Sequence, residues 1–188
     1  DIFVQAWYQG GMSLIDFTDS ANPVEIAFFD RGPIHDDALV LGGYWSTYWY
    51  DGRIYGTEIA RGLDVFALEP SEFLTENEIA AAALADQGQI FNPQQQFPVT
   101  WPAEPVVARA YMDQLARDSA LDAAMADDLE ATLASAEEAL AGESRDRDLA
   151  RTLKRMAKAL RKAPGDDMTA KRRASLAGTL DGIAKRLS

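Results

Sequence analysis

The 188-residue chain contains no cysteine, only one histidine and no long apolar run. Without cysteine it can form neither a disulfide nor a zinc site built on thiolates, although this absence does not indicate a cellular compartment. No segment approaches the ~18 consecutive apolar residues from which a membrane-spanning helix is recognised. These absences remove catalytic triads that use cysteine and predict that the chain has no transmembrane segment.

The two parts of the chain lack different residue types. Residues 1–102 have no lysine and only three arginines against fifteen acidic residues, so the whole net charge of −12 comes from this part. Residues 103–188 have one aromatic residue, Tyr111, and balance fifteen acidic with fifteen basic residues. An acidic first part repels phosphate backbones, which argues against nucleic acid as a partner.

The aromatic first part reads as short strands separated by turn residues. Runs rich in Val, Ile, Phe, Tyr and Trp are broken by Gly, Asn and Pro, which predicts antiparallel strands. Asp51-Gly52 is the signal for a tight hairpin turn. The expected strands are residues 2–8, 12–17, 24–29, 44–50, 53–59 and 63–68.

An internal repeat relates the two sets of strands at an offset of 51 residues. Residues 11–15 (GMSLI) fall on residues 62–66 (GLDVF), and Phe3-Val4 falls on Ile54-Tyr55. A period near 50 made of short antiparallel strands is typical of β-propeller blades. The first set lacks an innermost strand and the second an outermost one, so we expect the C-terminal end of a longer propeller, or a descendant of one.

A family resemblance supports this interpretation. Residues 7–23, WYQGGMSLIDFTDSANP, resemble the G-L-x-V-x-D-x-S-D-P-x-x-P signature of LVIVD-repeat proteins, which are bacterial and archaeal β-propellers, and residues 43–65 resemble the last repeat of that family. The chain departs from the pattern at Met12, where Leu is usual, at Ala21, where Pro is usual, and in having only two repeats. The resemblance implies a non-catalytic binding or structural scaffold that is extracellular, attached to the cell surface or periplasmic; the alternative location is cytoplasmic.

The remainder of the chain reads as helices. Thr75 to Glu78 form a capping box before a helix at about 76–86, and Pro105 opens a helix that ends near 117. A third helix is expected at 119–141 with Ser119 as its cap. The segments LARTLKRMAKAL (149–160) and LAGTLDGIAKRL (176–187) repeat the same aliphatic spacing and predict two antiparallel neighbours.

The predicted fold class is therefore α+β with segregated parts. It has antiparallel β-propeller blades followed by an α-helical bundle. We expect two incomplete blades at 1–70, a short helix and a Pro/Gln-rich linker at 71–102, and the bundle at 103–188. The apolar linker residues are expected to lie across the propeller face; they are Ile90, Phe91, Phe97 and Trp101.

Charge differs sharply between the expected helices. Residues 104–143 hold ten acidic and two basic side chains, whereas residues 145–162 hold eight basic and two acidic ones. One interpretation is that these faces neutralise each other within the bundle. The other is a basic patch for an anionic polymer, a membrane or the acidic strand part, and the aliphatic seam could alternatively receive a partner helix.

The aromatic strand at 44–50 has two interpretations. Alternation places Trp45 and Trp49 on one face and tyrosines on the other, as expected for a strand buried between stacked sheets. Alternatively, Trp45 and Trp49 form a platform for a flat ligand such as a sugar, with Glu58 and Asp64 as the nearby carboxylates. Two carboxylates are what glycan hydrolysis requires, so a carbohydrate-binding or glycan-processing module is the alternative function.

Oxygen ligands for a cation are also present. Asp16, Asp19 and Asn22 together could hold Ca²⁺, although Asp and Asn in turns usually bond their own backbone. His35 is followed by Asp36 and Asp37 in a long loop and is a further candidate for a metal site or a general base. The expected partners are further blades or another protein chain, with self-association through open strand edges, and no cofactor other than calcium is expected.

Overall fold

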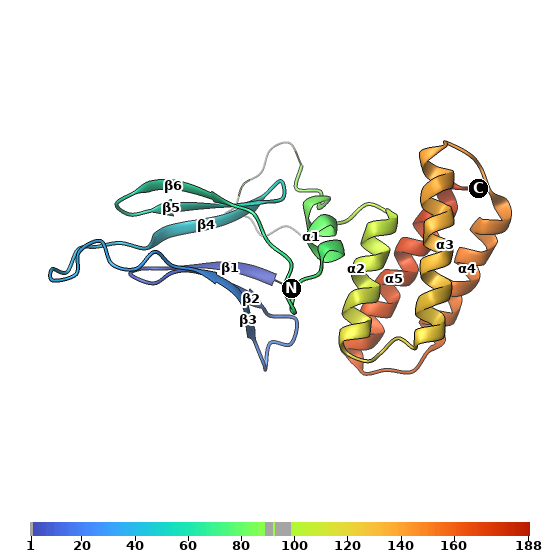
Figure 1. The fold of residues 1–188 in the computed structure, drawn as a ribbon. Helices are drawn as coiled ribbons and strands as arrows, with labels where there is room; N and C mark the ends of the chain where they lie inside the picture. The colour runs from blue at the N-terminus through green and yellow to red at the C-terminus, as the bar shows by residue number, and fades with distance from the viewer. Residues whose placement is uncertain (1, 89–91, 93–98) are drawn as a thin grey trace. The chain divides into compact units, whose positions relative to one another are not determined.

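The structure is a computed structural model that describes residues 2–88, 92 and 99–188, with six strands followed by five helices (Figure 1). The chain divides into two compact units. The strand unit comprises residues 1–74 and 87–99, and the helical unit comprises residues 75–86 and 100–188. Each unit is described by itself.

The strand unit contains two antiparallel three-stranded sheets. The first has the order β1 (Ile2–Trp7), β2 (Gly11–Asp16), β3 (Val24–Phe29), and the second the order β4 (Tyr44–Tyr50), β5 (Arg53–Glu58), β6 (Gly62–Phe66). Asp51 and Gly52 both have positive φ, 47° and 72°, as the tight β4–β5 turn requires. A register shift between Tyr44 and Ser46 interrupts the alternation expected for β4.

The hairpins β1–β2 and β5–β6 have the same register. Phe3 pairs with Ile15 in the first hairpin, and Ile54 pairs with Phe66 in the second. Both members of the second pair lie 51 positions after the corresponding members of the first. The third strand of each sheet lies on a different side of this shared hairpin. In the first sheet β3 follows β2, and in the second sheet β4 precedes β5.

The prediction of β-propeller blades is wrong. The described residues form two separate sheets with six strands in all, and they include neither a ring nor a barrel. A propeller needs at least about four sheets of four strands around a channel. Individual side chains of the two sheets contact each other instead. The rings of Phe29 on β3 and Phe66 on β6 lie 4.7 Å apart between their centroids.

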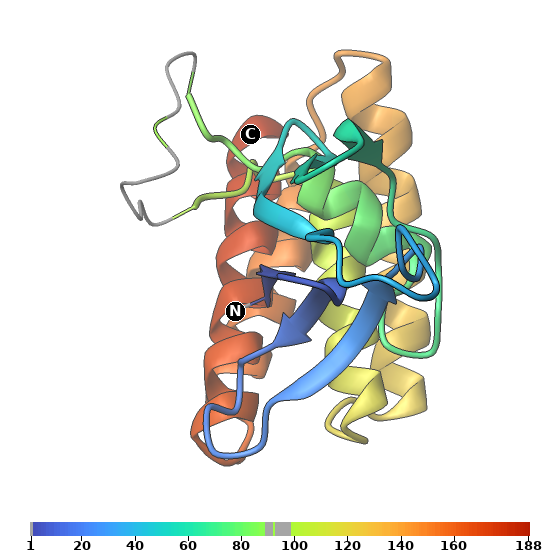
Figure 2. The ribbon, with the colours of Figure 1, turned by 90° about the vertical axis from the view of Figure 1, so that its left-hand side faces the viewer.

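The two sheets are linked where β1 meets β4 (Figures 1 and 2). Tyr8 and Gly43 form an antiparallel bridge, and the Thr47 hydroxyl donates to the carbonyl of Val4 at 3.3 Å. Among the described residues, the buried apolar side chains of this unit lie on four of the six strands and at Leu74 after β6; those on strands are Met12, Leu14, Ile26, Tyr44 and Ile54.

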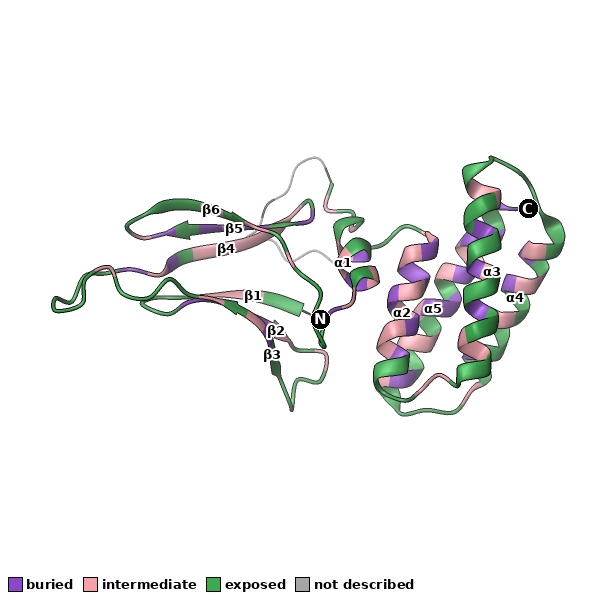
Figure 3. Cartoon of the chain, viewed as in Figure 1, coloured by how far each residue is buried: buried purple, intermediate pink, exposed green. Residues whose placement is uncertain are grey.

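The helical unit is a four-helix bundle with one short additional helix. The short helix α1 (Glu76–Ala83) precedes α2 (Pro105–Arg117), α3 (Ala123–Ala141), α4 (Arg147–Lys162) and α5 (Asp167–Arg186). Buried stretches follow the inner sides of the long helices and exposed residues the outer sides (Figure 3). The core is aliphatic, and its fully buried large side chains are Leu115, Leu129, Leu133, Leu153, Leu160, Leu176, Leu180, Ile183 and Leu187.

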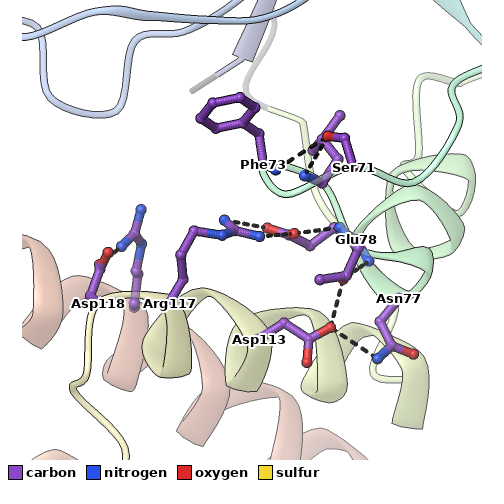
Figure 4. Close-up of polar contacts among 10 residues, drawn as sticks. Ser71, Phe73, Asn77, Glu78, Asp113, Arg117 and Asp118 are labelled. Atoms are coloured by element: carbon purple, nitrogen blue, oxygen red, sulfur yellow. Dashed lines mark hydrogen bonds and ion pairs between the residues drawn. The ribbon is translucent and has the colours of Figure 1, made fainter.

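A polar network joins α1 to α2 inside the helical unit (Figure 4). Thr75 and Glu78 form the predicted capping box, and the buried Glu78 carboxylate also pairs with Arg117, whose Nη1 lies 3.2 Å from Glu78 Oε1. Asp113 accepts hydrogen bonds from the Thr75 hydroxyl at 2.6 Å and from the Asn77 amide at 2.9 Å. The cap that starts α1 is thus held by side chains of α2.

The expectation for the linker can be compared with the structure only at its ends. Ile90, Phe91 and Phe97 lie outside the described residues. Trp101 is 44% exposed, and Asp86 pairs with Thr100 in an isolated antiparallel bridge within the helical unit. Across the described residues, no helix combines the length and the apolar character needed to cross a bilayer.

Candidate functional site

A cluster of charged side chains lies in the strand unit around Tyr44, the one large aromatic side chain that is buried among the described residues of this unit. The Tyr44 hydroxyl donates to Asp64 Oδ2 at 2.7 Å, and Arg31 Nη2 donates to Asp64 Oδ1 at 2.5 Å. The Arg31 guanidinium also lies 5.5 Å from the centre of the Phe29 ring, within range of a cation–π contact. Three segments that are distant in sequence therefore meet at Asp64.

The cluster shifts two pKa values in opposite directions. Burial and the hydrogen bond to Asp64 raise the pKa of the Tyr44 phenol well above its usual value. Partial burial by itself raises the pKa of Asp64, but hydrogen bonds from Tyr44 and Arg31 outweigh it and hold that pKa below its usual value. Near neutral pH, Tyr44 is thus a neutral donor and Asp64 an ionised acceptor.

We expect replacement of Asp64 by asparagine to lower the stability of the strand unit near neutral pH and to flatten its pH dependence. The folded pKa of Asp64 is depressed, so its contribution is present above the unfolded value of about 4 and is lost as pH falls through the folded value. Loss of hydrogen bonds to a charged group costs about 1–2 kcal/mol at pH 7. Urea titrations from pH 7 to pH 2 would measure this, with Asp36→Asn in the exposed loop as control. Equal pH dependence in wild type and Asp64→Asn would contradict the expectation.

Glu58 is the most buried carboxylate of the cluster, with a side chain only 1% exposed. Its Oε2 accepts the backbone N–H of Ala60 at 2.8 Å and that of Arg61, and its Oε1 lies 3.4 Å from Arg61 Nη1. Because Glu58 pairs with Gly62 across the hairpin, these bonds close the β5–β6 turn. Glu58 is therefore bonded within its own turn.

A cavity of about 160 Å³ opens beside these groups. The side chains of Arg31, Tyr44, Glu58 and Arg61 line it together with Gln9, Asp30 and the backbone of Gly42 and Gly43. Gly43 has φ 78°, and a Cβ there would lie 2.5 Å from the Trp7 carbonyl oxygen, so the wall of the cavity requires glycine. Polar groups and the apolar side chains of Pro33 and Ile34 line the space together, and it suits water or a small polar molecule.

The structure separates the tryptophans from the carboxylates of the predicted ligand site. Glu58 lines the cavity and Asp64 bonds to Tyr44 in its wall, but neither Trp45 nor Trp49 is a lining residue. Trp45 is 55% exposed and meets Tyr8 edge to face at 5.2 Å. Trp49 is half-buried, and its carbonyl accepts a hydrogen bond from the Gln87 amide at 2.9 Å.

Arginine side chains are the residues that the sequence interpretation missed. Arg31 pairs with Asp64 from 33 positions away, which no local pattern indicates. Arg61 follows Glu58 by three residues in a turn that ends at Gly62, a spacing that could have indicated the pair. In the observed arrangement each carboxylate is matched by an arginine and by further donors, which suits a structural cluster better than a reacting pair.

The proposed calcium ligands divide between two local turns. Asp19 accepts from the Asn22 amide at 2.8 Å and from the Ala21 N–H at 3.0 Å, and these bonds lower the pKa of Asp19. Asp16 accepts the N–H of Thr18 at 2.9 Å. The described residues include no group of three or more His, Asp or Glu side chains placed to share a metal ion. Calcium binding stays a prediction.

His35 also acts locally. Its Nδ1 accepts the backbone N–H groups of Asp37 and Ala38, each at 3.0 Å, on an exposed loop. This is the acceptor role that a turn-stabilising side chain performs.

No protein-family model, curated protein or solved structure matches this chain.

Proposed function

We propose that the chain is a non-catalytic binding or structural scaffold whose strand unit engages another protein chain. The observation that carries this proposal is the number of large apolar side chains that the outer strands expose. They are Ile2, Phe3 and Trp7 on β1, Val24 and Phe28 on β3, and Leu63 and Val65 on β6. Exposed apolar surface on this scale is typical of interaction surfaces.

The free edge of β6 is the most suitable docking position. Within the described residues β6 pairs only with β5, so one side of its backbone has no strand beside it. Leu63 and Val65 on this strand are 63% and 53% exposed. An unpaired edge with exposed apolar side chains favours a partner that adds a strand, because backbone hydrogen bonds and side-chain burial then act together. The same edge would also serve self-association.

The charged cluster supports a scaffold more than an enzyme. Glu58 and Asp64 are engaged by Arg61 and Arg31, and Tyr44 is held neutral. A general acid or base needs a pKa near the working pH and a free path to substrate. These carboxylates instead hold loops and turns in place.

The location and the kinship with LVIVD-repeat proteins are proposals of the same kind. The resemblance of residues 7–23 to the family signature supports both proposals, and it is their only support. The proposed location is extracellular, at the cell surface or periplasmic. The described residues of this chain do not form the ring architecture of the family.

Site-specific photo-cross-linking in the cells that make the protein tests the scaffold proposal. A photoreactive residue at Leu63 or at Val65 should give the same discrete protein adduct, identified by mass spectrometry. The matched control carries the photoreactive residue at Asp36, in the exposed loop. Adducts that are absent, or identical at all three positions, would refute the proposal; an adduct of the chain with itself would identify self-association.

A carbohydrate ligand is the second candidate, favoured by one observation. Tyr8 and Trp45 are 63% and 55% exposed and form an edge-to-face pair that offers two ring surfaces. On a glycan array the wild-type chain should then bind a defined sugar class, and Trp45→Ala should lose at least tenfold in affinity. Binding that is absent, or insensitive to Trp45→Ala, would exclude this site.

A further inference from the structure

We propose that two copies of this chain associate through the outer face of α3 and α4, with the acidic α3 of each copy against the basic α4 of the other. This surface belongs to the helical unit. It is therefore independent of the strand edge proposed above to engage a partner.

The two helices carry opposite charges on their exposed sides. Helix α3 contains no lysine or arginine, and its exposed acidic residues are Asp127, Asp128, Glu130, Glu137 and Glu138. Helix α4 contains one acidic residue, Asp148, and its exposed basic residues are Arg147, Arg151, Lys154, Arg155, Lys158, Arg161 and Lys162. Each helix has the charge pattern that the other would bind.

These charges do not neutralise each other inside the bundle. Glu130 and Glu137 of α3 pair with Arg109 of α2. On α4, Arg151 pairs with Asp148 of its own helix and Arg161 pairs with Asp181 of α5. Within the described part of the chain no ion pair joins α3 to α4.

Several charged side chains on both helices therefore have no ion-pair partner among the described residues. Lys154, Arg155, Lys158 and Lys162 form no ion pair among the described residues, and neither do Asp127, Asp128 and Glu138. Two adjacent, solvent-exposed helices that carry unpaired charges of opposite sign gain most from a partner surface on which the two signs are exchanged.

The bundle geometry permits a closed, symmetric pair. Contacts run from α2 to α3, from α3 to α4, from α4 to α5 and back to α2, so α3 and α4 are neighbours and share one outer side. Their inner sides pack into the hydrophobic core, where Leu129, Leu133, Leu153 and Leu160 are buried. A twofold axis parallel to the helices would place α3 over the partner's α4 and, at the same time, α4 over the partner's α3.

Small side chains on α3 help such an approach. Ala131 and Ala134 are exposed between the two acidic groups of this helix, and they would let the long basic side chains of a partner α4 lie across the helix. Because the pairs would be solvent-exposed and individually weak, association should depend steeply on salt.

The balanced charge of the helical part favours a second copy over an anionic polymer. The net charge of −12 comes from residues 1–102 and opposes nucleic acid or an anionic membrane at long range, whereas residues 103–188, which contain α3 and α4, carry no net charge. A second copy presents to α4 an acidic helix of similar length, because α3 has 19 residues and α4 has 16. Binding to polymers or vesicles is an outcome of the test.

Sedimentation velocity and light scattering on two charge-reversed variants test the proposal. One variant carries Lys154→Glu, Arg155→Glu and Lys158→Glu; the other carries Asp127→Lys, Asp128→Lys and Glu138→Lys. Circular dichroism confirms that each is folded, and Lys185→Glu on α5 is the control. At about 0.02 M salt, where the screening length exceeds 10 Å, we expect wild type to dimerise and about 0.5 M salt to dissociate it.

Each reversed variant alone should dimerise at least tenfold more weakly than wild type, because both of its interhelix contacts become repulsive. An equimolar mixture of the two should form a heterodimer, because both contacts are then attractive again. A monomeric wild type at low salt, unchanged dimerisation in the variants, or no heterodimer in the mixture would each overturn the proposal. Binding of wild type to anionic vesicles or DNA without dimerisation would also overturn it and would assign α4 to an anionic surface.

Discussion

Replacement of Gly11 by alanine is expected to unfold the strand unit locally or to destabilise it by about 3 kcal/mol or more. Gly11 begins β2 with φ 77°, and a Cβ there would lie 2.0 Å from the carbonyl oxygen of Phe29 on β3. The colliding atom is backbone, so relief requires β2 and β3 to separate. Hydrogen exchange read by mass spectrometry would show lost protection in residues 11–29.

Gly32→Ala is the matched control for this substitution. Gly32 also has a positive φ, 72°, but a Cβ there meets nothing within 4 Å. Gly32→Ala should lower the stability of the strand unit only by the backbone strain of an alanine at positive φ, about 1 kcal/mol. Similar losses of protection in both variants would show that the close approach of β3 to Gly11 is not important for stability.

Truncation of Leu153 to alanine is expected to destabilise the helical unit by about 2–5 kcal/mol. Leu153 lies on the inner side of α4, is 0% exposed and belongs to the aliphatic core shared with α5. The lost stability is the sum of two free energies: the transfer free energy of the removed atoms and the cost of the cavity that they leave. Guanidinium titration followed by circular dichroism at the helix band would measure it.

Leu84→Ala supplies the same chemical change at a position that is 41% exposed in the same unit. It should cost less than about 1 kcal/mol, because much of the Leu84 side chain already contacts water. A Leu153→Ala variant as stable as Leu84→Ala would contradict the assignment of Leu153 to the core.

Local signals in the sequence located most of the strands and helices. Asp51-Gly52 predicted the β4–β5 turn, and the two residues have the positive φ that this turn needs. The spacing of Leu153, Leu160 and Leu180 predicted the inner faces of two neighbouring helices, and all three are buried. Each of these features depends on residues close together in the chain.

One helix start was misplaced for a local reason. Ser119 was expected to cap the helix that ends at Ala141, but it adopts φ 55° just after α2. The cap of α3 is Asp122, whose carboxylate accepts the N–H of Met125 at 2.9 Å. Both residues are good caps, and sequence alone does not show which one has the required backbone conformation.

The architecture and the site needed information that the sequence does not carry locally. Strand pattern and period are the same for blades of a ring and for two sheets that contact each other, so the propeller was the wrong choice between them. Glu58 and Asp64 were identified, and the structure surrounds them with Arg31, Arg61 and Tyr44. Pairing across 33 positions is decided by tertiary structure.

The bridge between Tyr8 and Gly43 has a consequence for the kinetics of folding. The two sheets can meet only after the 34 residues between these positions have closed into a loop, whereas α4 and α5 are separated by residues 163–166 alone. Closure of this loop slows the meeting of the two sheets, whereas short-range contacts speed the packing of α4 against α5. Helices α4 and α5, although synthesised after the strands, should reach their native arrangement faster than the strands do.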